Sequence, residues 1–288
     1  MLRSIYVSSL CVFLSSCFHS SKTQPGANVT PASEPKPCQS AKEYVTTLNY
    51  LKSKELTQLS EERKRDIAFR VATYCEGAAD RFIKVSELLL RAQLGPRDSI
   101  EKGVQYASLS NAHAQAFVEV FKANYLKEML DMDLLTSLKT AESVSNNPNL
   151  DAEVTKEDYF KLVKFCLASD RIAQSRPYCV KWAGKMALYG KPGHPVANAF
   201  TELFTFLTQD DGGPKLATHD AIKVSEDVFA KSPLAGKDFI EAYQFASSKK
   251  GHDWDRSAAA KFAQRLIVAS HYESPVTEEK TLEKQPKE

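Results

Sequence analysis

Two similar stretches of sequence indicate how this chain folds. Residues 117–121 read Phe-Val-Glu-Val-Phe and residues 131–133 read Asp-Met-Asp, whereas residues 239–243 read Phe-Ile-Glu-Ala-Tyr and residues 253–255 read Asp-Trp-Asp. In both stretches the leading aromatic residue precedes the second aspartate by sixteen positions. Such a fixed spacing sets the length of a first helix and its turn, so that a second helix folds back in register. We interpret each stretch as one unit of a tandem array of helical hairpins.

The same spacing recurs along most of the chain. Aromatic residues that could lead a unit are separated by 35 to 42 residues, a period typical of two-helix solenoids: Tyr44, Phe82, Phe117, Tyr159, Phe200 and Phe239. Sixteen residues after five of them stands a residue suited to cap a helix N-terminus: Ser60, Asp98, Asp133, Ser175 and Asp255. In the unit of Phe200 the expected cap, Asp220, follows after twenty residues. The alternative is an irregular all-helical domain.

Apolar residues recur at helical spacing in almost every segment between residues 41 and 270, and no segment alternates as a strand would. Helices are expected to begin near residues 41, 60, 78, 98, 112, 133, 156, 175, 196, 218, 238 and 255. The prediction is an all-α, α-solenoid-like array of about six antiparallel helix pairs with no sheet. The signature residues of tetratricopeptide and ankyrin repeats are missing, so the helical domain resembles no named family.

The first seventeen residues are typical of an export signal. Arg3 supplies a positive charge, and residues 5–14 are mostly apolar but too few to span a bilayer. They are followed by an aliphatic residue, two small residues and a cysteine, at Leu14-Ser15-Ser16-Cys17. These four residues resemble the lipobox of bacterial lipoprotein precursors. The resemblance implies cleavage after residue 16 and lipidation of Cys17, whose acyl chains would anchor the protein in a membrane.

Phe18 follows the cysteine, where an aspartate would imply retention at the inner membrane, so the resemblance favours the outer membrane, facing the periplasm. An ordinary secretory signal with a chance cysteine is the alternative. Residues 17–37 are rich in Pro, Ser and Thr and are expected to form a flexible tether. Residues 38–272 form the predicted repeat domain, and residues 273–288 a disordered tail.

Four cysteines remain after signal removal and lipidation: Cys38, Cys75, Cys166 and Cys179. An even number in an exported chain suggests disulfides, with three connectivities open. Cys38 and Cys75 fall at the same end of the first predicted hairpin, whereas Cys166 and Cys179 flank one turn. The expected links are therefore 38–75 and 166–179, and free buried thiols are the alternative.

No motif for chemistry stands out in the sequence. Asp253 and Asp255, with His252, could ligate a cation, but their position at a helix start favours capping, and His219-Asp220 is interpreted in the same way. Ser-x-x-Lys occurs at residues 99–102 and 247–250 without the companion motifs of penicillin-binding enzymes. Trp182 and Trp254 are expected in the core. We predict no catalytic residue, metal site or cofactor.

The net charge of +2 provides no strong field for nucleic acid. The favoured hypothesis is a lipid-anchored bacterial envelope protein whose helical array binds an unidentified protein or peptide partner, because solenoids expose long surfaces. A cell-envelope enzyme, for example one that acts on the cell wall, is the alternative. A structural or chaperone-like role is a third hypothesis.

Overall fold

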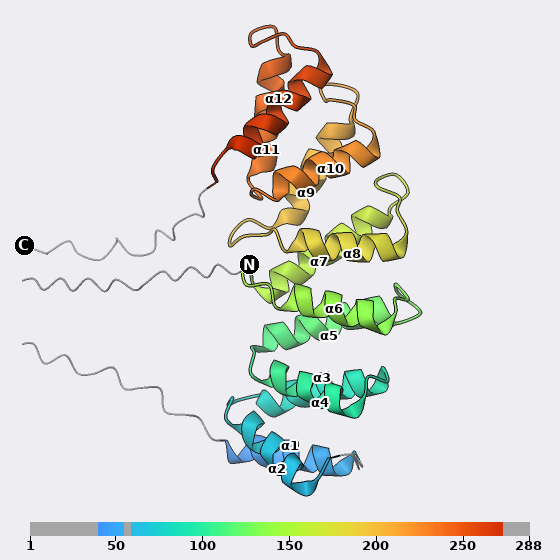
Figure 1. Ribbon diagram of the computed structural model, residues 1–288, viewed down its shortest axis with the longest axis vertical. Helices are drawn as coiled ribbons and strands as arrows, with labels where there is room; N and C mark the ends of the chain where they lie inside the picture. Colours follow the sequence, from blue (N-terminus) through green and yellow to red (C-terminus); the bar gives the residue numbers. More distant parts are fainter. Residues whose placement is uncertain (1–39, 55–58, 273–288) are drawn as a thin grey trace, which may run out of the picture. The chain divides into compact units, whose positions relative to one another are not determined.

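The computed structural model describes residues 40–54 and 59–272, which form helices arranged as consecutive pairs (Figure 1). The chain divides after Pro37 into two units, and every described residue belongs to the second, Cys38–Glu288. The helices are α1 (Ala41–Ser53), α2 (Glu61–Ala72), α3 (Ala78–Arg91), α4 (Pro96–Ala107), α5 (Asn111–Tyr125), α6 (Leu134–Ser145), α7 (Ala152–Leu167), α8 (Arg176–Ala187), α9 (Val196–Thr208), α10 (Thr218–Phe229), α11 (Ala235–Ser247) and α12 (Arg256–Ala269).

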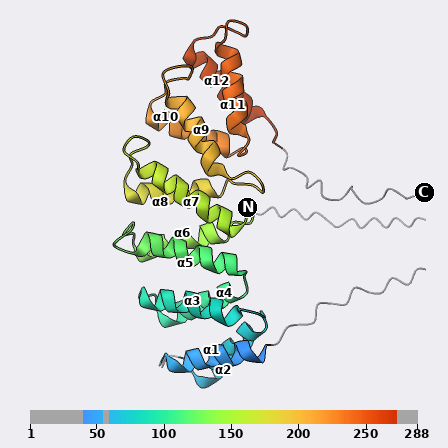
Figure 2. The same cartoon turned by 180° about the vertical axis from the view of Figure 1, so that it is seen from behind.

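Each odd-numbered helix packs most closely on the even-numbered helix that follows it, which gives six pairs within the described residues. We call the odd-numbered helices A helices and the even-numbered ones B helices. Every A helix also packs on the next A helix, so that the A helices form one continuous layer, as Figure 2 shows from behind. The described residues contain no strand, only one isolated bridge between Lys191 and His194. The predicted all-α array of about six helix pairs is confirmed.

The leading aromatic residues fill the core of the array. Five of the six are fully buried: Phe82, Phe117, Tyr159, Phe200 and Phe239. Tyr44, in the first unit, is only half-buried, and Val45 of α1 is exposed. In α1 the buried positions are instead Glu43, Thr47, Tyr50 and Leu51. The aromatic position therefore marks the core wherever a unit has neighbours on both sides.

The turns between paired helices repeat at the level of the backbone. Asp131, Ala173 and Asp253 each stand fourteen residues after the leading aromatic and have φ values of 53°, 57° and 54°. In each case the residue's N–H donates to the carbonyl oxygen five residues earlier, at Leu126, Ala168 and Ser248 respectively. Three units of different sequence thus adopt one turn, which supports the tandem-repeat interpretation.

Two expected helix caps are wrong. α4 begins at Pro96, so that its N-cap is Gly95 and Asp98 lies in the first turn. Proline suits the first position of a helix because the N–H it lacks would have no helical partner. α10 begins at Thr218 after Ala217, so that Asp220 is also a first-turn residue.

α5 ends at Tyr125 because the repeated turn begins at Leu126. Two other helix boundaries differ from expectation. α7 begins four residues early because Asp151 caps it by accepting from the N–H of Glu153 (2.8 Å). α11 begins at Ala235 rather than near residue 238.

Two buried carboxylates join one unit to the next. Glu43 of α1 accepts a hydrogen bond from the N–H of Ala79 in the first turn of α3 (2.6 Å), and Asp158 of α7 accepts one from the N–H of Val196 at the start of α9 (2.6 Å). A helix start has N–H groups without intrahelical partners, and a carboxylate both satisfies them and interacts favourably with the helix dipole. Desolvation of the carboxyl raises the pKa of Asp158 above its ordinary value.

A disulfide joins Cys166 at the end of α7 to Cys179 in the first turn of α8, as expected from the sequence. The same two positions hold Ala246 and Ala259 in the α11–α12 pair, and all four residues are fully buried. The bond therefore closes a hairpin whose geometry other units reach without a covalent link.

The other expected link cannot be described in the same way, because Cys38 and the lipidation residue Cys17 lie outside the described residues. The N–H of Ser40 donates to the carbonyl oxygen of Ala72 (3.2 Å), so that the chain just after Cys38 runs beside the chain just before Cys75. The 38–75 link stays a prediction. Among the described helices, none is both long and apolar enough to cross a bilayer.

Candidate functional site

Polar side chains bridge successive A helices in the first half of the array. The Lys54 ammonium, just after α1, pairs with Glu87 of α3 (3.1 Å), and the Lys156 ammonium of α7 pairs with Glu119 of α5 (2.6 Å). Between α3 and α5, Lys84 donates to the side-chain oxygen of Gln115 (3.1 Å). These contacts cover the seams between the helices on the exposed side of the layer, which we call the A face.

The seam between α7 and α9 is filled by aromatic rings instead. Phe165 of α7 lies edge-on to Phe200 and Phe204 of α9, with ring centroids 6.0 and 5.4 Å apart. Between α9 and α11, no side-chain hydrogen bond or ion pair joins the two helices in the described part of the chain, and the rings of Phe206 and Tyr243 meet edge-on with centroids 5.3 Å apart. Both rings are buried, and outside them the last seam of the A face is left open.

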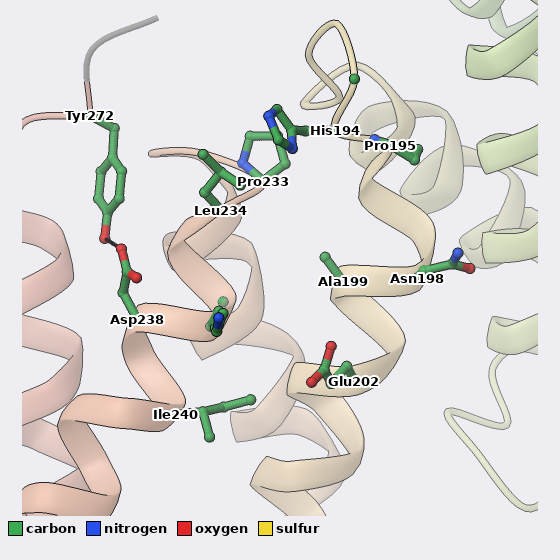
Figure 3. A pocket seen from close by; sticks show the side chains of 13 residues that line it. His194, Pro195, Asn198, Ala199, Glu202, Pro233, Leu234, Asp238, Ile240 and Tyr272 are labelled. Atoms are coloured by element: carbon green, nitrogen blue, oxygen red, sulfur yellow. Dashed lines mark hydrogen bonds between the residues drawn. The ribbon is translucent and has the colours of Figure 1, made fainter. Parts of the chain in front are cut away.

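A groove occupies this open seam. It comprises two overlapping hollows of about 560 and 540 Å³ that share Asn198 and Glu202 of α9 and Ile240 of α11. Figure 3 shows the wider hollow, with α9 on one side and the start of α11 on the other. Its further lining comes from the loop before α9, from the loop before α11 and from the chain after α12: His194, Pro195, Pro233, Leu234 and Tyr272.

The two walls of the groove differ in chemistry. Along α9 and its C-cap residue, most of the lining is polar, at Asn198, Thr201, Glu202, Thr205 and Gln209, and Ala199 and Phe206 contribute apolar surface. This spacing places the side chains on one stripe of the helix, opposite the buried stripe that contains Phe200 and Phe204. The α11 wall supplies apolar surface through Leu234, which is 45% exposed, and through Ile240, and it also carries Lys237 and Asp238. The groove therefore combines polar and apolar lining.

One end of the groove is closed by a hydrogen bond from the chain that follows α12. The Tyr272 hydroxyl donates to the Asp238 carboxylate (2.9 Å), as drawn in Figure 3. Burial and the neighbouring Asp238 charge both raise the pKa of Tyr272 above its ordinary value, so that the phenol stays a donor at neutral pH. Among the described residues Glu202 has no ion-pair partner, and it is the acidic residue among the α9 side chains that line the groove.

This arrangement suits the binding of an extended chain segment. Asn198 and Gln209 carry both donors and acceptors, as a peptide backbone requires. Ile240 and Leu234 offer apolar contact to a side chain, and the Glu202 carboxylate favours a positive charge opposite it. Within the described residues no group of three or more His, Cys, Asp or Glu side chains is placed to hold a metal ion.

A second hollow of about 500 Å³ lies beside α7 and is almost entirely apolar. Its lining includes Met129, Leu130, Phe160 and Leu167, and Lys164 is its one charged residue among the lining side chains. It lacks the side-chain amides and hydroxyls that line the α9–α11 groove. We therefore place the candidate site between α9 and α11.

The acidic residues that the sequence singled out have structural roles. Asp133 and Asp255 cap α6 and α12 by accepting from backbone N–H groups of Thr136 (2.8 Å) and Ala258 (2.9 Å). Asp253 was expected to cap a helix as well, and this is wrong: it occupies the left-handed position of the repeated turn. Aspartate tolerates this conformation better than most residues do.

The tryptophans divide between core and surface. Trp182 is buried, as expected, and its ring lies 4.9 Å from that of Phe200. Trp254 is 40% exposed, so that its expected core position is wrong. It stacks on His252 with ring centroids 4.5 Å apart, at the turn between α11 and α12. The histidine therefore belongs to an aromatic cluster.

The remaining candidates do not come together. His219 is exposed in the first turn of α10, where the helix N-cap is Ala217. Ser99 is buried and donates to the carbonyl oxygen of Leu94 (3.0 Å), while Lys102 pairs with Glu142. The structure thus gives Ser99 and Lys102 separate structural contacts.

Sequence reasoning did not identify the groove residues. The available signal was the run of polar residues Asn198, Thr201, Glu202, Thr205 and Gln209 at helical spacing. Comparison with protein-family models, with curated proteins and with solved structures finds no match to this chain.

Proposed function

We propose that this protein is a lipid-anchored bacterial envelope protein whose helical array binds an extended segment of a partner protein in the α9–α11 groove. The observation that supports the proposal is the open seam. Polar side chains pair across the first three seams between A helices, whereas the last seam is joined by the buried rings of Phe206 and Tyr243 and keeps amides, hydroxyls and a carboxylate available for a ligand.

The walls suggest what the partner segment contains. An aliphatic or aromatic side chain would pack on Ile240 and Leu234, and a Lys or Arg side chain would lie opposite Glu202. Asn198 and Gln209 would bond the backbone between these anchors. Such a segment would bind through side-chain pockets and backbone contacts without a chemical reaction.

The anchor rests on the resemblance of residues 1–17 to lipoprotein precursors. Lipidation of Cys17 would tether the array to a membrane, and Phe18 favours the outer membrane with the array in the periplasm. The partner would then be another envelope protein, because only such proteins share this compartment.

Site-specific photo-crosslinking in the native envelope tests the proposal. A photoreactive residue replaces Thr205, an exposed residue on the groove wall, and in a matched strain it replaces Lys181, which is exposed on α8. We expect one defined protein to be captured from position 205 and not from position 181, and Ile240→Glu to abolish its capture. Equal capture at both positions, or capture that persists with Ile240→Glu, would exclude the groove.

A further inference from the structure

The α7–α8 and α11–α12 units correspond residue by residue at a spacing of 80. Their leading aromatics are Tyr159 and Phe239, and their left-handed turn residues are Ala173 and Asp253. The helices α8 and α12 also begin 80 residues apart. A side chain in the α11–α12 unit therefore points in the same direction, relative to its own unit, as the equivalent side chain in the α7–α8 unit.

In the α7–α8 unit, side chains on the side that faces α9 and α10 pack against that following unit. The rings of Phe165 and Trp182 pack on Phe200 of α9, with centroids 6.0 and 4.9 Å away, and Met186 is fully buried. On the B helices, Lys185 of α8 pairs with Glu226 of α10 (2.8 Å). The following unit thus covers a mainly apolar surface.

The equivalent residues of the last unit are also apolar, but no described helix covers them. Phe245 and Leu266 stand where Phe165 and Met186 stand, and they are 55% and 45% exposed. Phe262, at the position of Trp182, is half-buried under Trp254, whose ring lies 5.3 Å away. We call Phe245, Trp254, Phe262 and Leu266 the end face.

An exposed surface of this kind is unusual at the end of a repeat array. Terminal repeats ordinarily carry a polar outer side that keeps the protein soluble, and apolar patches on monomers usually mark an interaction site. Asp158 accepts a hydrogen bond from the start of the following A helix, whereas its equivalent Asp238 accepts one from the Tyr272 hydroxyl. Tyr272 therefore occupies the position that the start of a following A helix would take. The aromatic part of the end face stays open.

The first unit presents the complementary surface at the other end of the array. The ninth residue of a B helix contacts the B helix before it in later units: Glu142 pairs with Lys102, Glu226 with Lys185, and Gln264 donates to Asp227 (3.0 Å). In α2 the ninth residue is Phe69, which is 54% exposed. On α1, Tyr44 and Leu48 occupy the positions of Phe200 and Phe204 and are only half-buried. We call Tyr44, Leu48 and Phe69 the front face.

We propose that the front face of one copy of this chain binds the end face of a second copy, so that copies associate head to tail. The interface continues the one between successive units within the chain: Tyr44 and Leu48 would meet Phe245 and Phe262, as Phe200 and Phe204 meet Phe165 and Trp182. Phe69 would lie near Arg265, the equivalent of Lys185, and the Arg265 guanidinium would make a favourable cation–π contact with the Phe69 ring. A heterologous contact of this type does not close on itself in a dimer.

Sedimentation velocity of the full chain, purified in a mild non-ionic detergent, tests this inference. We expect the weight-average mass of the wild-type protein to rise with concentration, whereas Phe69→Glu and Leu266→Glu should each weaken association at least about ten-fold. Leu135→Glu is the matched control, because Leu135 is 58% exposed on α6 in the middle of the array. Circular dichroism checks that each variant is folded.

Mixing the two variants identifies the geometry. The Phe69→Glu chain keeps its end face and the Leu266→Glu chain keeps its front face, so that an equimolar mixture should form a 1:1 complex that neither variant forms alone. A wild-type protein that stays monomeric at all concentrations would overturn the proposal. Association of Phe69→Glu at wild-type strength would instead indicate two end faces in contact. Association only after removal of residues 273–288 would indicate that the chain's own C-terminal segment occupies the end face.

Discussion

Removal of the Cys166–Cys179 disulfide offers a quantitative test of the equivalence between units. The α11–α12 hairpin has Ala246 and Ala259 at these positions, so the double variant Cys166→Ala/Cys179→Ala should keep the same backbone. The two cysteines are 13 residues apart. By the chain-entropy model, a loop of this length corresponds to about 3 kcal/mol of stabilisation, which the variant should lose.

Urea unfolding followed by circular dichroism measures this difference. Wild type and double variant are compared, each in its oxidised and in its reduced form. The free energy of unfolding should be about 3 kcal/mol lower for the oxidised double variant than for the oxidised wild type, and the two reduced proteins should agree within about 1 kcal/mol. A double variant that cannot fold, or one as stable as the oxidised protein, would refute the reasoning.

Three further predictions follow from contacts in the array and from the N-terminal sequence. Asp158→Ala should lower the free energy of unfolding by about 1–3 kcal/mol because the buried Val196 N–H loses its acceptor, whereas Asp158→Asn keeps an acceptor. Burial raises the pKa of Asp158 in the folded protein above its ordinary value of 3.8. The free energy of unfolding of the wild type, relative to that of Asp158→Asn, should therefore fall as pH rises from 3.8 through the higher pKa of the folded state. Unfolding curves between pH 3 and 7 check both effects. Gly103→Ala should cost about 1–3 kcal/mol in thermal or urea unfolding, since its Cβ would lie 2.9 Å from a backbone oxygen of α3, while Gly95→Ala, with open space around it, should change stability by less than about 0.5 kcal/mol. Cys17→Ser should move the protein from the membrane to the soluble fraction on cell fractionation, and continued membrane association would contradict lipidation.

The helical architecture was predictable because each unit repeats local signals. The fixed distance from a leading aromatic to an N-cap held in the units of Tyr44, Phe117, Tyr159 and Phe239. This distance did not predict the N-cap in units whose turn has a different length. In the unit of Phe82 the turn is shorter than in these units and contains Gln93 in the left-handed region instead. Spacing alone cannot distinguish a cap from a first-turn residue when both are polar.

Exposure at the end of the array was not predictable from periodicity. Phe245 and Leu266 lie at helical spacing from core residues, and of their equivalents in the α7–α8 unit Phe165 contacts α9 and Met186 is fully buried. They are exposed because no described unit follows α12, which is a property of the array's length. The sequence pattern of the last unit is that of an internal one, and this mismatch is the basis of the proposed self-association.

The groove depends on the absence, among the described residues, of polar side-chain contacts between α9 and α11, which a single helix does not reveal. Glu119 and Lys156 are unremarkable on their own helices, and they cover the α5–α7 seam only because the two helices pack side by side. Their hydrogen bond lowers the pKa of the Glu119 carboxyl. The corresponding seam between α9 and α11 has Glu202 without such a partner. Only the packed structure shows which polar side chains remain available.

The central claim is that the α9–α11 groove holds a segment of another protein in the envelope. The most direct measurement is thiol labelling of Asn198→Cys, in the groove, and of Lys181→Cys, on exposed α8, with a bulky maleimide. The account predicts that Asn198→Cys is protected in intact envelopes and reacts fully after purification, whereas Lys181→Cys reacts equally in both. Full and equal reaction of Asn198→Cys in both settings would contradict the claim.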